Sequence, residues 1–319
     1  WITARNGDLV KTRVVSSGQA TRIISDICSD IFHATPVFNS EGLNKRYPTG
    51  QQISAAQKVV DAMLSHPLDE TLGLEGHGPE IAALNALLKM TGILRYSDDR
   101  GWLVEAPDNN PSLQHLWSQI DLFLDACQTE EKQSFKVLVN FVTCPPFGIR
   151  QGVLPIIFAA VLRSRIKAVT IRHNDRPIHP IDGKLITEMV WEPQEYTIDV
   201  GVWDDTHERL WQALYNRFSS HIHESERNQQ PLTLLKVSIL RWLQGLPAFC
   251  RDTQRLSSKA IRFRNIVRAA QGDPAKAFFE DLPDLLGVTA TSPTEVIVTS
   301  IENLTGEISS AYLDLLRRL

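Results

Sequence analysis

The stretch KQSFKVLVNFVTCPPFGIRQGVLPIIFAAVLRSRIKAV, residues 132–169, holds the densest apolar surface of the chain and decides its fold. Apolar residues at three- and four-residue spacing predict a helix before the Pro145-Pro146 pair, because such residues share one helix face. They are Phe135, Leu138, Val139 and Val142. A residue before proline is pushed out of the α region, so this helix should end at Cys144.

Residues 152–165 form the second predicted helix of this stretch. Apolar side chains cover almost every side of it between Leu154 and Leu162, so the helix should be buried rather than laid on a surface. After it, residues 168–172 alternate as a strand does, and Asn174-Asp175 supplies turn residues for a hairpin. The order helix, turn, helix, hairpin is that of a winged helix.

A similar order of elements precedes this one. Helices are predicted over residues 53–66 and 80–90, and Ile93–Tyr96 and Trp102–Val104 flank turn residues as in a hairpin. Beyond the central hairpin the pattern is largely helical. The sequence therefore predicts a mostly α fold with small β-hairpins, in which tandem winged-helix-like modules precede a C-terminal helical bundle.

This pattern predicts three domains. Residues 1–110 would form an N-terminal helical and winged-helix-like domain, 111–203 a central winged-helix domain, and 204–319 a C-terminal helical domain. The helices expected in the last domain run from Asp205 or Thr206 to Ser220 and over residues 232–243, 251–271 and 293–319.

Composition narrows the possible functions. The formal net charge of −4 and the pI near 6.2 give no overall attraction to nucleic acid, so any such contact needs a local basic patch. Four cysteines without paired spacing favour reduced thiols in a cytoplasmic setting over a disulfide framework or a zinc site. The longest apolar run is far shorter than the roughly 20 residues of a membrane span. Because no methionine precedes Trp1, we expect the chain to be part of a longer polypeptide.

Two basic sets are the candidate nucleic-acid-binding residues. The first surrounds the second helix-turn-helix, and the second recurs at helical steps further along the chain. Their members are Arg150, Arg163, Arg165, Lys167, Arg172 and Arg176, and then Arg255, Lys259, Arg262 and Arg268. The predicted recognition helix has almost no polar residue to read bases, which fits phosphate contact, protein docking or a purely structural role.

No pattern in the sequence indicates catalysis, a metal or a cofactor. The glycine-rich segment 72–79 lacks the lysine and hydroxyl residue of a phosphate-binding loop, and Pro79-Glu80 instead predicts the start of a helix. His221 and His223 stand two apart without a third ligand fixed by spacing. There is no Gly-x-Ser-x-Gly elbow.

Three strings resemble the middle regions of large bacterial P-loop ATPases, among them the large ATPases of BREX-type phage-defence islands. They are Ile27-Cys28 through Thr35-Pro36, Pro145-Pro-Phe-Gly-Ile-Arg-Gln-Gly-Val-Leu-Pro155, and Trp242-Leu-Gln-Gly-Leu-Pro247 with Thr253 and Leu256-Ser257. The family's nucleotide loop has no counterpart here. The resemblance thus implies a non-catalytic segment beyond the motor domain, coupling nucleotide state to a nucleic acid or a partner protein.

The leading hypothesis is therefore an interaction module of a larger antiviral-defence ATPase. Its expected partners are the other domains of that polypeptide and DNA, without a membrane. One alternative is a metal-dependent nuclease or hydrolase whose site assembles only in three dimensions. The other is a winged-helix transcription regulator, which requires a dimer surface and polar residues on its reading helices.

Overall fold

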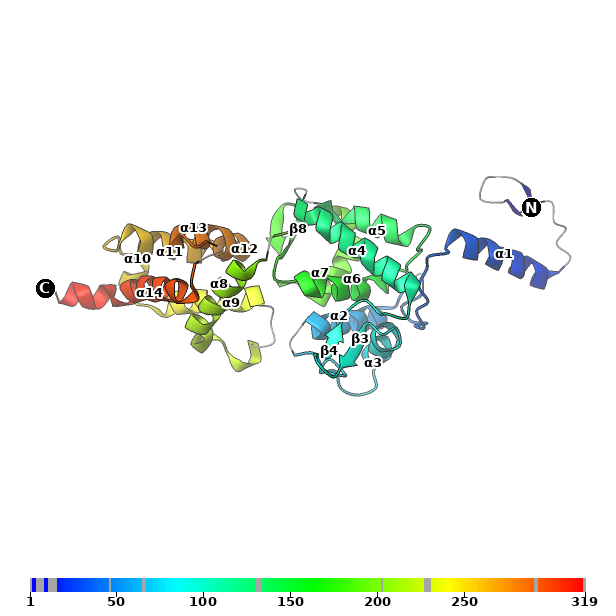
Figure 1. The fold of residues 1–319 in the computed structure, drawn as a ribbon, viewed down its shortest axis with the longest axis horizontal. Coiled ribbons are helices and arrows are strands. Elements are labelled where there is room, and N and C mark those ends of the chain that lie inside the picture. The colour runs from blue at the N-terminus through cyan, green and yellow to red at the C-terminus, as the bar shows by residue number, and fades with distance from the viewer. Residues whose placement is uncertain are drawn as a thin grey trace. The chain divides into compact units, whose positions relative to one another are not determined.

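A computed structural model describes most of the chain. Of its residues, 62% are helical, and the strands form small antiparallel sheets (Figure 1). The predicted mostly α fold with small β-hairpins is thus confirmed, while the winged-helix and bundle assignments stay predictions. None of the described helices has the apolar length that a bilayer crossing requires. The described residues are 2–3, 9–10, 16–45, 47–64, 67–129, 133–178, 180–201, 203–226, 231–289 and 292–317.

The chain divides into two compact units. The predicted boundary at residue 110 lies inside unit 1, and residues of the predicted central domain, 111–203, belong to both units. Unit 1 comprises Trp1–Leu64, Leu68–Ser164 and Asp182–Ile198. Unit 2 comprises Ser65–Pro67, Arg165–Ile181 and Asp199–Leu319.

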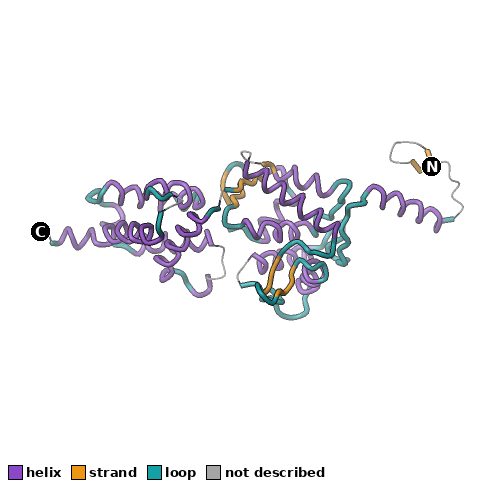
Figure 2. Tube along the Cα trace, viewed as in Figure 1, coloured by secondary structure: helices purple, strands orange, loops and turns teal. Residues whose placement is uncertain are grey.

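Unit 1 combines short strand pairs with helices, and Figure 2 shows how far the helices dominate. Strand β1 pairs with β2, β3 with β4, and β5 with β8, all antiparallel. Its elements are β1 (Ile2–Thr3), β2 (Leu9–Val10), α1 (Ser17–Ile31), α2 (Gly50–Leu64), α3 (Pro79–Leu84), η1 (Asn85–Lys89), β3 (Leu94–Ser97), β4 (Gly101–Val104), α4 (Pro111–Thr129), β5 (Gln133–Ser134), α5 (Phe135–Thr143), α6 (Leu154–Leu162), α7 (Gly183–Trp191), η3 (Pro193–Glu195) and β8 (Tyr196–Val200), the last ending in unit 2.

Helix α6 lies at the centre of unit 1. Every one of its nine residues is buried, and α2, α4 and α7 pack against it. The Phe158 ring also meets the Phe135 ring of α5, with 4.8 Å between centroids. A helix without a polar face can only be stable when it is enclosed, and the predicted burial is confirmed.

The first predicted helix of the opening stretch is α5, and it ends at Thr143 as the prolines require. The four residues of its apolar face are at most 4% exposed. In the following turn Gly148 has a φ of +65°, and a Cβ there would lie 2.6 Å from the Phe32 ring. Only glycine fits this turn, because it lacks the Cβ.

Both predicted hairpins are present. In unit 1, β3 pairs with β4 in the register Leu94↔Val104. In unit 2, β6 (Val169–His173) pairs with β7 (Arg176–Ile178), and both turn residues, Asn174 and Asp175, have positive φ. Asn and Asp tolerate that conformation better than most residues, so the turn forms locally.

Most of the other described residues of unit 2 belong to helices that pack around an apolar core. That core runs from Leu210 to Ile308 and includes the aromatic residues Phe218, Trp242, Phe263 and Phe278. The helical elements are α8 (Asp205–Phe218), η4 (Ser219–His221), η5 (Glu224–Glu226), α9 (Pro231–Gly245), α10 (Ala248–Asp252), α11 (Ser258–Ala269), α12 (Pro274–Lys276), η6 (Ala277–Asp281), α13 (Leu282–Leu286) and α14 (Thr294–Leu316), while η2 (Arg163–Arg165) spans the passage between the units.

The single helix predicted over residues 251–271 is wrong, because the chain breaks between α10 and α11. Ser257 caps α11 by accepting a hydrogen bond from the Ala260 N–H. The carboxylate of Glu307 in α14 binds both the Ser257 N–H, at 2.5 Å, and its hydroxyl, at 2.8 Å. A partner 50 residues away thus stabilises the new helix start, which local propensity could not indicate.

Candidate functional site

A cavity of about 470 Å³ in unit 2 is the candidate functional site. Its volume lies in the range of about 300–1,000 Å³ that is typical of ligand pockets. Two strands supply one side. Thr170 and Arg172 come from β6, and Asp199 comes from the end of β8, where the Gly201 N–H donates to the Ala168 carbonyl at 2.8 Å.

Two helical segments supply the other side. Trp203 directly precedes the N-cap of α8, and His207 lies in the first turn of that helix, which a capping box fixes. The Asp204 carboxylate accepts from the His207 N–H at 3.0 Å and contacts the His207 imidazole at 2.7 Å. The backbone N–H of His207 holds the pKa of Asp204 below its usual value, although burial opposes this. The cap therefore fixes where the His207 ring lies.

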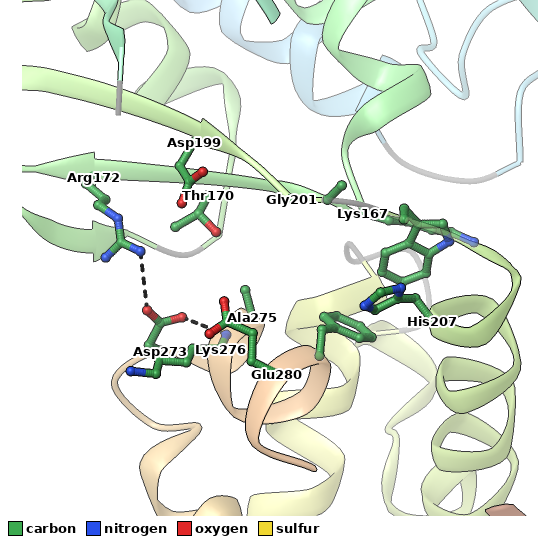
Figure 3. A pocket seen from close by; sticks show the side chains of 13 residues that line it. Lys167, Thr170, Arg172, Asp199, Gly201, His207, Asp273, Ala275, Lys276 and Glu280 are labelled. Carbon is green, nitrogen blue, oxygen red and sulfur yellow. Dashed lines mark hydrogen bonds and ion pairs between the residues drawn. The ribbon is translucent and has the colours of Figure 1, made fainter. Parts of the chain in front are cut away.

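Aromatic rings form the cavity wall beside the start of α8. The Trp203 and Phe279 rings meet edge to face, with 4.7 Å between centroids, and the His207 ring lies 5.8 Å from Phe279. Phe279 belongs to the π-helical turn η6, some seventy residues along the chain from α8. Figure 3 shows His207 and Arg172 at opposite ends of the cavity.

Two ion pairs involve charged residues of the cavity lining. Lys167 contacts Glu208 at 2.8 Å, and its Nζ lies 5.3 Å from the centroid of the Trp203 ring. Burial raises the pKa of Glu208, but hydrogen bonds from Lys167, Trp203 and Gln212 outweigh it, so the pKa is lowered. The Glu208 carboxylate is therefore charged at neutral pH.

The second ion pair joins the two sides of the cavity. Arg172 faces Asp273 at 3.6 Å, and Asp273 also accepts from the Lys276 N–H at 3.1 Å (Figure 3). Three further charged residues line the cavity without an ion-pair partner among the described residues: Asp199, Lys276 and Glu280. The lining residues outside the two ion pairs therefore contribute two carboxylates and one ammonium group to the cavity.

The structure brings only two members of the first predicted basic set, Lys167 and Arg172, to this cavity. Arg163 donates to the Met63 carbonyl of α2, and burial lowers its pKa. Arg165 is half-buried. Arg150 and Arg176 are exposed, Arg150 in a loop of unit 1 and Arg176 in the β6–β7 hairpin.

The second predicted basic set is only partly gathered on one face. Arg255, Lys259 and Arg262 are exposed and have no ion-pair partner in the described part of the chain. Arg268 lies about 180° around α11 from Lys259, since each residue turns a helix by about 100°. There it pairs with Asp252 of α10 at 2.7 Å.

The two histidines weighed as metal ligands lie beside an ion pair instead. Arg241 binds the Glu226 carboxylate through two nitrogens, at 2.9 and 2.7 Å, and also donates to the His221 carbonyl. Within the described ranges no three His, Cys, Asp or Glu residues gather as metal ligands would.

Acid should selectively weaken the Glu226–Arg241 bond. Hydrogen bonds from Arg241, then from the His223 N–H, lower the pKa of Glu226 from 4.5 to about 2. A carboxyl group whose pKa is lower in the folded state stabilises the fold at pH values above its unfolded-state pKa. This stabilisation is lost as the pH falls through the folded-state pKa. Thermal melting should therefore show Glu226→Gln less stable than the wild type above pH 4.5, with the difference gone by about pH 2. The neighbouring Glu224→Gln is the control, and a pH-independent difference would contradict the assignment.

Sequence reasoning missed the aromatic and acidic residues of the cavity: Asp199, Trp203, His207, Asp273, Phe279 and Glu280. The one local signal for any of them was the capping box at the start of α8, formed by Asp204 at the N-cap and His207 three residues later. Comparisons with protein-family models, curated proteins and solved structures found no match for this chain.

Proposed function

We propose that the chain is a non-catalytic docking module that holds a segment of a partner protein in the cavity of unit 2. The observation that carries this proposal is an aromatic wall, Trp203 and Phe279, beside charges of both signs in one cavity. Protein interfaces are anchored by buried aromatic residues with a polar rim.

Protein docking is favoured over nucleic-acid binding by the state of the basic residues. Lys167 and Arg172 are paired with carboxylates of unit 2, so their charges are not free to replace counterions on phosphates. Arg163 is bonded to the Met63 carbonyl within unit 1. Helix α6 has no exposed face to enter a DNA groove. The exposed members of the two basic sets remain as places where DNA contact would occur, and Arg255, Lys259 and Arg262 lie closest together in the sequence among them.

The resemblance of the three sequence strings supports a place for this module in a larger ATPase of the phage-defence kind. In such a protein the partner segment would come from another domain of the same polypeptide or from an associated protein. Docking needs no nucleotide loop in this chain, which agrees with the absence of that motif from its sequence.

Selection of a displayed peptide library against the full 319-residue chain tests the docking function. We expect enriched peptides whose affinity falls by about thirty-fold in Trp203→Ala, since truncating a central interface tryptophan costs about 2 kcal/mol. Tyr312→Ala removes an exposed aromatic residue of α14 outside the cavity and should bind like the wild type.

Two results would contradict protein docking. One is the absence of any peptide whose binding depends on Trp203. The other is tight binding of a short DNA duplex that weakens steeply with added salt and is lost in Lys259→Ala with Arg262→Ala, which would assign nucleic-acid binding instead. Thermal melting of each variant separates lost binding from lost folding.

A further inference from the structure

We infer that the partner segment enters the cavity of unit 2 with a basic side chain, a lysine or an arginine. The inference rests on the proposed docking function and specifies the chemistry of the partner. Three observations within unit 2 carry it: the balance of the unpaired charges, the aromatic wall, and a lysine of the chain itself that already occupies a comparable environment.

The unpaired charges favour a cation. The charge of Glu208 cancels that of Lys167, and the charge of Asp273 cancels that of Arg172. Asp199 and Glu280 then face the cavity against Lys276 alone. An entering ammonium or guanidinium group would restore the balance and form charge-assisted hydrogen bonds to the carboxylates. An entering carboxylate would instead meet two like charges.

The aromatic wall favours the same ligand. The face of an aromatic ring attracts a cation within about 6 Å of its centroid, and tryptophan is the best of these rings. The ring of Trp203 and the half-buried ring of Phe279 lie in the same cavity as the carboxylates of Asp199 and Glu280. A basic side chain could therefore contact a ring and a carboxylate together, with its aliphatic part against the apolar surface.

Lys167 shows that this part of unit 2 accommodates an ammonium group. Its Nζ lies 5.3 Å from the centroid of Trp203 and 4.8 Å from that of Trp211, while Glu208 neutralises its charge at 2.8 Å. Aromatic rings and a carboxylate thus already hold one cation at the edge of the cavity. The partner's basic side chain would repeat this arrangement with Phe279, Asp199 and Glu280.

Three dye-labelled peptides that differ only in a central Arg, Leu or Glu test the inference by fluorescence anisotropy with the full chain. We expect the Arg peptide to bind about ten-fold more tightly than the Glu peptide, with Leu between them. The double variant Asp199→Asn with Glu280→Gln should lose this preference. Both substitutions keep the side-chain shape, and thermal melting checks that the variant folds.

The matched control is Glu302→Gln, which removes an exposed carboxylate of α14 outside the cavity and should keep the preference for Arg. Equal or tighter binding of the Glu peptide would overturn the inference, as would an unchanged preference in the double variant. If the displayed library yields Trp203-dependent peptides without Lys or Arg, docking stands and the basic side chain is wrong. If it yields no Trp203-dependent peptide, docking itself fails.

Discussion

Gly183→Ala should destabilise unit 1 by about 3 kcal/mol or more, at the upper end of overpacking costs. Gly183 is the first residue of α7 and lies against the backbone of α2. A Cβ at this position would stand 2.2 Å from the carbonyl oxygen of Gln57 and 2.7 Å from its Cα. Because both atoms belong to a helix backbone, no side-chain rotation relieves the clash, and α7 must move away from α2.

That movement would also break a specific bond. The Gly183 N–H donates to the Asp61 carboxylate at 2.7 Å. Burial raises the pKa of Asp61, and the bond from Gly183 partly offsets that effect. Loss of the bond leaves the Asp61 carboxylate with one donor fewer, which adds to the cost of the displaced helix.

Urea unfolding measures the loss, and hydrogen exchange followed by mass spectrometry should show faster exchange in α2 and α7. Gly50→Ala is the matched control, since Gly50 begins α2 and nothing lies within 4 Å of its added Cβ. If Gly183→Ala unfolded at the same urea concentration as Gly50→Ala, the close approach of α7 to α2 would be disproved.

Arg264→Ala should destabilise unit 2 by about 3 kcal/mol, because it leaves both a cavity and two carbonyls without a donor. The side chain of Arg264 is almost fully buried in α11, and burial lowers its pKa. Its Nη1 donates to the carbonyls of Cys250 and Thr253, at 3.3 and 2.8 Å. These carbonyls lie at the end of α10, so Arg264 stabilises the break between α10 and α11.

Arg262→Ala provides the comparison, since Arg262 is exposed two residues earlier in the same helix. Its melting temperature should stay close to that of the wild type, because surface substitutions usually change stability by less than about 0.5 kcal/mol. Equal melting of the Arg264 and Arg262 variants would show that the buried arginine has no structural role. The basic residues of α11 thus have separable roles, one internal and the others on the surface.

Local sequence determined several elements of this protein. The spacing of Phe135, Leu138, Val139 and Val142 indicated α5, the unbroken apolar run of α6 indicated burial, and Asn174-Asp175 indicated the turn between β6 and β7. Each of these signals acts between residues near in sequence, where helix periodicity and turn conformation operate.

Tertiary structure alone decided the cavity and the break before α11. The cavity joins residues 167–172, 199–207 and 273–280, and the break depends on Glu307 binding Ser257. Neither has a periodic pattern, because contacts between distant segments depend on how whole helices pack. The sequence alone shows that Lys167 and Arg172 are basic residues. Only the folded chain shows that Glu208 and Asp273 already neutralise them, because these partners are distant in sequence.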